Sequence, residues 1–324
     1  MPAEMKLGSG QIPGFRAEQQ DAFALGEAIL ADRRHAGLMI IADGMGGHVG
    51  GAKAARIAID TFLRICSSAT ETSFVSMLEA ALKGANQALA AEKRDHPELE
   101  GMGCTIVAAV ADHRMLHFIS VGDSILWRWD KAGLSRINAD HSMSPLLDES
   151  IRRGEMTEEE AHGHRSGLRS ALTGNAIALT DKGSIEWTDE DAFLLASDGI
   201  LTLEEEDIAA IITGNCADPG LQSQAAVDDL LDQVELCAPP DQDNCTLILI
   251  ARANMNGQAD AVPNRARRWL NTLFRPNVLT MIMGLGLAGL AGVALMGANG
   301  NWDRFKILYD LPGVDTEAAR KARL

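Results

Sequence analysis

Four aspartates stand at the ends of short apolar runs, and this arrangement constrains the fold more than any other feature of the sequence. Asp43 follows GLMIIA, Asp123 follows FISVG, Asp198 follows FLLAS, and Asp243 stands just before CTLILI. A single aspartate in such a place is most often a turn or cap residue. If strands bring the four ends together, the carboxylates repel one another unless divalent cations neutralise their charge. Oxygen ligands, without His or Cys at matching spacing, favour Mg²⁺ or Mn²⁺ over Zn²⁺.

The segment that follows Asp43, GMGGH, is rich in glycine. Glycine adopts backbone conformations that a side chain blocks, so the carbonyl of Gly44 can turn inward beside Asp43 as a further oxygen ligand. Two interpretations stay open for His48 at the end of this segment. It is either a general acid or a histidine at a helix start that bonds to nearby backbone.

The spacing of apolar residues predicts both strands and helices. Short apolar runs typical of strands occupy residues 37–43, 104–110, 115–121, 125–129, 192–197 and 245–251, and we expect the three between 104 and 129 to be antiparallel neighbours. Helical spacing occurs over 49–66, 74–92, 204–213 and 222–236. Because helices come in pairs instead of following every strand, an α+β sandwich is favoured over a doubly wound parallel sheet. Residues 142–166 are polar and charged, which predicts a mobile excursion with one helical turn near 157–161.

Composition narrows the classes of function. The net charge of −16 argues against a nucleic-acid partner, because affinity for the phosphate backbone comes mainly from Lys and Arg. The five cysteines form no C-x-x-C pair, which indicates buried thiols in a reducing compartment. The N-terminus has no basic region followed by an apolar run, so we expect no secretory signal and a cytosolic location for most of the chain.

The composition changes after Arg252. Residues 253–276 are polar and then basic, and 277–298 contain the uncharged apolar run VLTMIMGLGLAGLAGVALM, about as long as a membrane-spanning helix requires. A buried core helix is the alternative. Four arginines precede this run, at positions 265, 267, 268 and 275, so the positive-inside rule places the N-terminal part in the cytoplasm. The sequence therefore predicts a globular domain over 1–252, a juxtamembrane linker over 253–276, a transmembrane helix over 277–298 and a short tail over 299–324.

Eight motifs in order give the sequence a specific resemblance. They are GFRAEQQDA (14–22), ADGMGGHVGG (42–51), GMGCT (101–105), VGDS (121–124), DHS (140–142), LRSALTG (168–174), LLASDGI (194–200) and DNCT (243–246). With them the chain resembles, over residues 10–252, the bacterial form of the type 2C (PPM) metal-dependent Ser/Thr protein phosphatase family. The resemblance implies a four-layer α-β-β-α sandwich with two antiparallel sheets, in agreement with the pattern of apolar residues.

The resemblance also implies a set of metal ligands, with two Mn²⁺ or Mg²⁺ ions in the site and a possible third. Asp43 would bridge two ions, with Asp198 and Asp243 on one of them and the carbonyl of Gly44 on the other. Asp123 would hold a third, more weakly bound ion together with Asp198.

Two residues near the N-terminus have implied roles in catalysis. Arg16 matches the phosphate-binding arginine of the family, whose forked guanidinium pairs with phosphate oxygens. Asp21 stands where the family keeps a carboxylate that is hydrogen-bonded to metal-bound water. Gln19 and Gln20 depart from the Asn or Glu that the family often has there. Asn244 either supports Asp243 through local hydrogen bonds or is an ordinary turn residue.

The implied activity is hydrolysis of phosphoserine and phosphothreonine in proteins by metal-activated water, at the cytoplasmic face of the bacterial inner membrane. The single-pass helix would contact membrane lipid, and the partners would be phosphorylated proteins, the substrates of a Ser/Thr kinase. One alternative is a membrane-anchored pseudo-phosphatase that binds phosphoproteins or other partners without turnover. Another retains the activity but acts on a different phosphoprotein, such as an anti-sigma antagonist.

Overall fold

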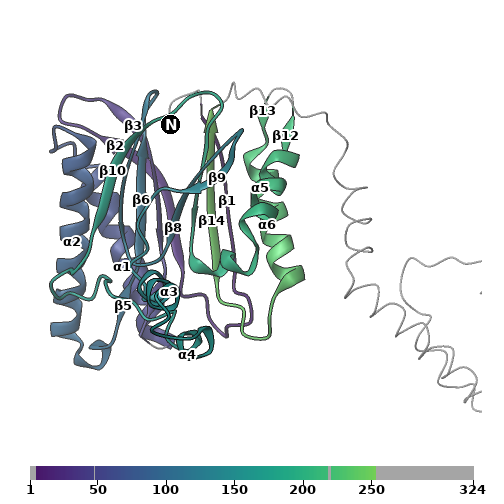
Figure 1. The fold of residues 1–324 in the computed structure, drawn as a ribbon. Coiled ribbons are helices and arrows are strands. Elements are labelled where there is room, and N and C mark those ends of the chain that lie inside the picture. The colour runs from purple at the N-terminus through teal and green to yellow at the C-terminus, as the bar shows by residue number, and fades with distance from the viewer. Residues whose placement is uncertain (1–4, 47, 218–219, 253–324) are drawn as a thin grey trace, which may run out of the picture. The chain divides into compact units, whose positions relative to one another are not determined.

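Two five-stranded antiparallel sheets face each other in the computed structural model, which describes residues 5–46, 48–217 and 220–252 (Figure 1). The first sheet has the strand order β1 (Met5–Ile12), β14 (Cys245–Arg252), β11 (Ala192–Ala196), β8 (Ile125–Asp130) and β9 (Gly133–Arg136). The second has the order β10 (Asp181–Glu186), β7 (Met115–Val121), β6 (Ile106–Ala111), β3 (His35–Ala42) and β2 (Ala22–Ile29).

Helices cover the outer face of each sheet. On the second sheet lie α1 (His48–Cys66) and α2 (Phe74–Asp95), and on the first lie α5 (Glu205–Gly214) and α6 (Ser223–Cys237) (Figure 1). The predicted four-layer α+β sandwich is therefore confirmed for the described residues. The shorter elements are β4 (Gly44–Met45) paired with β5 (Gly103–Cys104), β12 (Cys216–Ala217) paired with β13 (Gly220–Leu221), and the 3₁₀ helices η1 (Pro97–Leu99) and η2 (Asp198–Thr202).

The central strands are apolar on both faces because each sheet lies between two layers. In β3, Leu38 and Ile40 pack in the core beneath α1 and α2, whereas Met39 and Ile41 pack in the core between the sheets. All four side chains are fully buried. Burial of each contributes about 1.5–3 kcal/mol relative to exposure. This two-sided burial explains why such strands appear in the sequence as continuous apolar runs and not as alternating patterns.

One of the outer helices illustrates why these segments are helical. Ser73 caps α2, since its hydroxyl accepts a hydrogen bond from the Ser76 backbone N–H at 3.1 Å. The buried residues of α2, among them Met77, Ala81 and Leu89, recur at helical spacing along the face that meets the sheet. The predicted helix over 74–92 is thus confirmed.

The prediction that the three strands between 104 and 129 are neighbours was wrong for the last of them. Strand β8 pairs with β11 and β9 in the first sheet, whereas β6 and β7 belong to the second. The chain crosses between sheets at Gly122, which has φ +105° and whose missing Cβ would lie 2.5 Å from Cβ of Thr105. The short turn between β7 and β8 therefore connects the two sheets and does not join neighbouring strands of one sheet.

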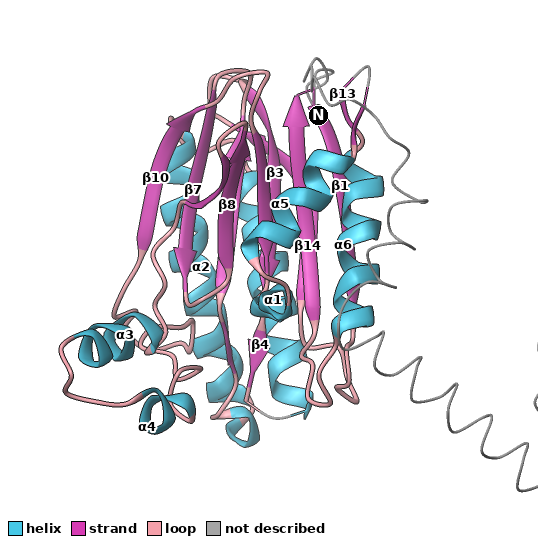
Figure 2. Cartoon of the chain, turned by 45° about the vertical axis from the view of Figure 1, so that its right-hand side comes forward, coloured by secondary structure: helices cyan, strands magenta, loops and turns pink. Residues whose placement is uncertain are grey.

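The polar segment 142–166 contains two helices instead of one turn. The predicted turn is confirmed as α4 (Glu158–His162), which begins with a capping box formed by Thr157 and Glu160. The additional helix is α3 (Ser144–Arg152). Both lie at one end of the sandwich, outside its four layers (Figure 2). Arg165 connects them through ion pairs with Asp148 (2.6 Å) and Glu158 (2.7 Å).

The predicted linker (253–276), transmembrane helix (277–298) and tail (299–324) lie outside the described residues. Among the helices that the structure does describe, none is both long enough and apolar enough to cross a membrane.

Candidate metal centre

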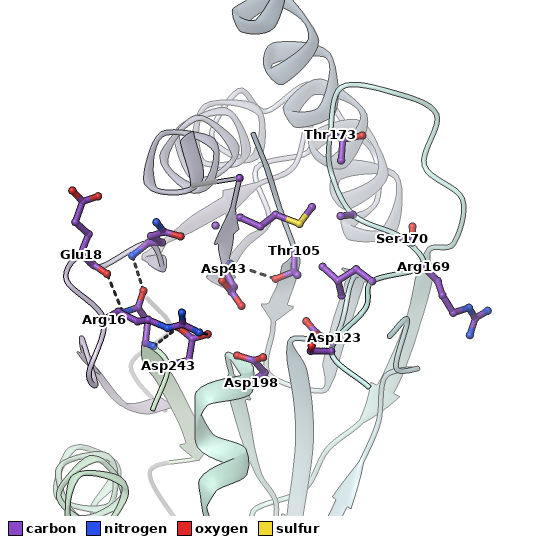
Figure 3. A pocket seen from close by; sticks show the side chains of 18 of the residues that line it. Arg16, Glu18, Asp43, Thr105, Asp123, Arg169, Ser170, Thr173, Asp198 and Asp243 are labelled. Atoms are coloured by element: carbon purple, nitrogen blue, oxygen red, sulfur yellow. Dashed lines mark hydrogen bonds and ion pairs between the residues drawn. The ribbon is translucent and has the colours of Figure 1, made fainter. Parts of the chain in front are cut away.

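Strand direction brings the four aspartates to one end of the sandwich. Asp43 follows β3 and Asp123 follows β7, and these strands run in the same direction because each is antiparallel to β6. Asp198 follows β11 and Asp243 precedes β14; because these two strands are antiparallel, the end of one lies beside the start of the other. All four side chains line a pocket of about 770 Å³ (Figure 3). The sequence prediction that these positions meet is confirmed.

The pocket places carboxylates where they are difficult to ionise. Burial, together with the charges of Asp21 and the other three aspartates, raises the pKa of Asp43 well above its usual value. Burial and the charges of Asp123 and Asp243 raise the pKa of Asp198 to about 7. Burial likewise raises the pKa of Asp123 to about 6. A cation bound among these groups would favour their charged forms and relieve the repulsion between them.

Asp21 does not line the pocket and lies in a network of hydroxyl groups. Its Oδ2 atom accepts hydrogen bonds from Ser197 Oγ and Thr246 Oγ1, each at 2.7 Å, and the residue is buried. Burial raises the pKa of Asp21, while the two hydroxyls lower it. Neither Ser197 nor Thr246 was assigned a role from the sequence. Each is close in sequence to a predicted metal ligand, since Ser197 directly precedes Asp198 and Thr246 is in the same motif as Asp243. This closeness could have identified both residues.

A second pair of hydroxyls connects the turns that carry Asp43 and Asp123. The Thr105 N–H donates to the Asp43 carbonyl at 2.8 Å, and the Asp43 N–H donates to Thr105 Oγ1 at 3.4 Å. Thr105 Oγ1 also shares a 2.6 Å hydrogen bond with Ser124 Oγ, next to Asp123. These bonds fix the ends of β3 and β7 relative to each other, and they too were missed by the sequence analysis.

Arg16 and Asp243 bind each other. Arg16 Nε lies 3.0 Å from Asp243 Oδ1, and Nη2 lies 2.8 Å from Oδ2, which makes a bidentate pair at the pocket rim (Figure 3). Both side chains are partly open to solvent, 55% and 42% exposed. Arg16, the predicted phosphate ligand, and Asp243, a predicted metal ligand, are thus close together. They bind each other, however, and not a phosphate or a metal ion.

Asn244 holds the loop that carries Arg16. Its backbone N–H donates to Asp243 Oδ1 at 2.8 Å, a local hydrogen bond that does not involve the Asn244 side chain. Its side chain also donates to the carbonyls of Pro13 (2.9 Å) and Glu18 (3.1 Å) and accepts from the N–H of Gln20 (2.7 Å). The side chain therefore joins two segments that are far apart in the sequence.

Gly44 lines the pocket as the first residue of β4. A Cβ at this position would lie 2.2 Å from the carbonyl oxygen of Gly51, so the close approach of α1 requires glycine. Its role as a carbonyl ligand stays a prediction. The side chain of His48, for which two interpretations were open, lies outside the described part of the structure.

The chemistry of the pocket fits hard divalent cations. Its charged ligands are carboxylates, and Asp123 Oδ1 is buried without a hydrogen-bond partner among the described residues, as a carboxylate oxygen reserved for a cation would be. Within the described ranges, however, no three His, Cys, Asp or Glu side chains already form a complete ligand set. One of the four aspartates, Asp243, is bonded to Arg16 instead. Ions would have to draw the carboxylates together and recruit carbonyl or water oxygens.

Comparisons with known proteins agree with this fold. PstP of Mycobacterium tuberculosis, a serine/threonine protein phosphatase, is 33% identical over 190 residues, which cover 57% of this chain and 34% of PstP. The chain thus matches about a third of that relative's length. Stp of Listeria welshimeri, a serine/threonine phosphatase, is 26% identical over 273 residues, which cover 81% of this chain and all of Stp.

A solved structure of one relative has the same fold. The catalytic domain of PstP in complex with two manganese ions matches with a TM-score of 0.63 and 25% identity, covering 77% of this chain and 99% of that domain. The model of the protein phosphatase 2C family matches residues 16–238. The chain therefore belongs to the protein phosphatase 2C family.

Proposed function

We propose that the chain hydrolyses phosphoserine and phosphothreonine in proteins with the help of Mn²⁺ or Mg²⁺. The observation that carries this proposal is the meeting of Asp43, Asp123, Asp198 and Asp243, from four separate strand ends, in one pocket with Arg16 at its rim. The relatives that match most of this domain are named serine/threonine phosphatases, and one was solved with two manganese ions. These names support the proposed substrate class and the proposed cations.

The chain's own residues would divide the work as follows. Asp43, Asp198 and Asp243, with the carbonyl of Gly44, would hold two cations, and Asp123 with Asp198 would hold a third. When bound, such ions acidify water and neutralise charge on phosphoryl oxygens.

Arg16 would orient the phosphate, since its fork of N–H groups matches two phosphate oxygens in the way it now matches the two oxygens of Asp243. Asp21, fixed by the hydroxyls of Ser197 and Thr246, would accept a hydrogen bond from metal-bound water. Because the pocket opens to solvent beside Arg16, a phosphorylated side chain on a protein surface can enter it.

Two measurements test the activity. Hydrolysis of a generic aryl phosphate and of a phosphothreonine peptide should require added Mn²⁺ or Mg²⁺ and stop when a chelator removes them. Asp198→Asn should lower turnover at least about a hundredfold because it withdraws a charged ligand shared between two sites. Asp123→Asn should be milder and depend on metal concentration. Asp189→Asn, an exposed carboxylate paired with Arg252, is the matched control and should leave turnover unchanged.

Activity that survives exhaustive chelation, or full turnover in Asp198→Asn at limiting metal, would overturn the metal-dependent mechanism. Binding of phosphopeptide without any hydrolysis at saturating metal would identify a pseudo-phosphatase instead.

We further propose that the protein acts at the cytoplasmic face of a bacterial inner membrane. The apolar run VLTMIMGLGLAGLAGVALM supports a single membrane span, and the arginines that precede it support a cytoplasmic catalytic domain. Its substrates would be phosphoproteins produced by a Ser/Thr kinase and reached from that face. Fractionation of the full chain with the membrane, and its release only by detergent, tests this proposal.

A further inference from the structure

Besides Arg16 and Arg169, which line the pocket, a third arginine lies beside the site without lining the pocket. Arg136 is the last residue of β9, and its side chain extends to the turn between β7 and β8, where Nη2 donates to the main-chain carbonyl of Asp123 at 2.9 Å. The side chain is only 25% exposed. Asp123 lines the pocket, whereas Arg136 approaches the same residue from behind.

The surroundings of Arg136 are acidic. Nη1 lies 3.4 Å from Asp140 Oδ2. Burial lowers the pKa of Arg136, whereas the charges of Asp140, Asp123 and Glu205 raise it. A guanidinium nevertheless keeps its proton in proteins. The turn that carries Asp123 therefore has a permanent positive charge next to it, among three carboxylates.

Two buried polar atoms near this turn have no hydrogen-bond partner among the described residues. Among the described residues, three buried side-chain polar atoms have no hydrogen-bond partner, and two of them are Asp123 Oδ1 and Arg136 Nε. A buried polar atom without a partner costs stability, so it is usually explained by a function or by an ion or water. A neutral donor could have bonded the Asp123 carbonyl equally well. Arg136 therefore places a positive charge between Asp140, with which it pairs, and the turn that carries Asp123.

We propose that Arg136 is a positioning residue for Asp123 whose fixed positive charge weakens the binding of the third divalent cation. This inference rests on the proposed function, in which Asp123 and Asp198 hold that cation. Arg136 should weaken the binding and not strengthen it, because a cation at Asp123 must approach a positively charged guanidinium that is bonded to the same residue. Arg136 sets the metal concentration at which the third ion binds, while the ions at Asp43 and Asp243 are less affected.

The test is a Mn²⁺ titration of the full chain without substrate, followed by calorimetry and by the EPR signal of free Mn²⁺. Arg136→Gln removes the charge but keeps an N–H donor, and it should tighten the weakest Mn²⁺ ion at least about threefold while the tighter ions stay within about twofold. Arg136→Lys restores the charge and should bind like the wild type. Asp123→Asn should abolish the weak ion, which identifies it.

Arg114→Gln is the matched control for loss of a charge, because Arg114 is 69% exposed and pairs with Glu186. It should leave every Mn²⁺ affinity unchanged. Thermal melts in chelator should show that each variant is folded.

The inference is overturned if Arg136→Gln leaves the weak ion unchanged or loosens it, if Arg136→Lys behaves like Arg136→Gln, or if no weak ion binds to either protein. Failure of the wild type to bind any Mn²⁺ would instead refute the proposed function.

Discussion

At the scale of single residues, the bidentate pair between Arg16 and Asp243 couples phosphate binding to metal binding. Asp243 cannot give both oxygens to a cation while Arg16 holds them, and Arg16 cannot give its fork to a phosphate while it holds Asp243. Since both side chains are partly exposed, the pair is weak enough to be exchanged. A cation that takes Asp243 would therefore also release Arg16 toward phosphate.

This exchange predicts opposite effects of one substitution on two ligands. Arg16→Ala should raise KM for a phosphopeptide about tenfold or more, because a charge-assisted bidentate contact is lost. The same change should tighten Mn²⁺ binding in the absence of substrate by up to about fivefold, because a competitor for Asp243 is removed. Steady-state kinetics and calorimetry measure the two effects separately. Weaker Mn²⁺ binding in Arg16→Ala would mean that Arg16 supports Asp243 as a ligand and does not compete for it.

At the scale of elements, the site depends on turns that are packed against one another. The 3₁₀ helix η2, which starts at Asp198, lies against the turn at Asn244. Gln242 Nε2 donates to the Gly199 carbonyl at 2.9 Å, and the Gln242 side chain also bonds the Thr202 hydroxyl. The turn before β14 and the turn after β11 are thereby held as one unit, which fixes Asp198 relative to Asp243.

Gly199 makes this packing possible and offers a test of it. A Cβ at position 199 would lie 2.1 Å from the Asn244 carbonyl oxygen, so Gly199→Ala must push the two turns apart. We expect a loss of about 1–3 kcal/mol in the free energy of unfolding, together with weaker Mn²⁺ binding. Gly163→Ala is the matched control, since its Cβ would meet no atom within 4 Å. Chemical denaturation and Mn²⁺ titration measure both effects, and equal stability of the two variants would contradict the packing argument.

At the scale of the whole molecule, the last described element of the sandwich is β14, an internal strand of the first sheet. Strand β14 pairs with β1 along its whole length, from Cys245 to Arg252, and with β11 from Leu247 to Ala251. The guanidinium of Arg252 lies 4.9 Å from the centre of the Trp187 ring and pairs with Asp189 at 3.1 Å. The last residue of the strand is therefore part of the folded domain, and we expect a domain boundary after it.

This boundary predicts the behaviour of a shortened chain. Truncation after Arg252 should give a soluble protein that is folded and has the activity of the full chain, because both neighbours of β14 remain in place. The full chain should fractionate with membranes, and a reporter fused after Leu324 should face the periplasm. Loss of the fold in the truncated protein, or solubility of the full chain without detergent, would show that residues 278–296 are a core helix.

The sequence by itself determined the elements whose pattern reflects their burial. Continuous apolar runs mark strands that contact a layer on each face, as in β3, β7 and β14. An apolar helical face marks a helix that contacts one sheet, as in α1 and α2. The aspartates at the strand ends were visible for the same reason, because a charge interrupts each apolar run. Strands at the sheet edges gave no such signal. In β1 and β10, most residues are only partly buried, and their backbone pairing does not depend on the side chains that a sequence pattern records.

Only the tertiary structure decided how the strand ends are arranged around one another, and therefore which further polar groups become partners. The crossing at Gly122 placed β8 in the other sheet, and the antiparallel pairing of β11 with β14 brought Asp198 beside Asp243. The hydroxyls around Asp21, the pair between Arg16 and Asp243, and the position of Arg136 behind Asp123 all follow from that arrangement. Such contacts join residues far apart in the sequence, and their energy depends on distance and burial, which no local pattern of residues contains.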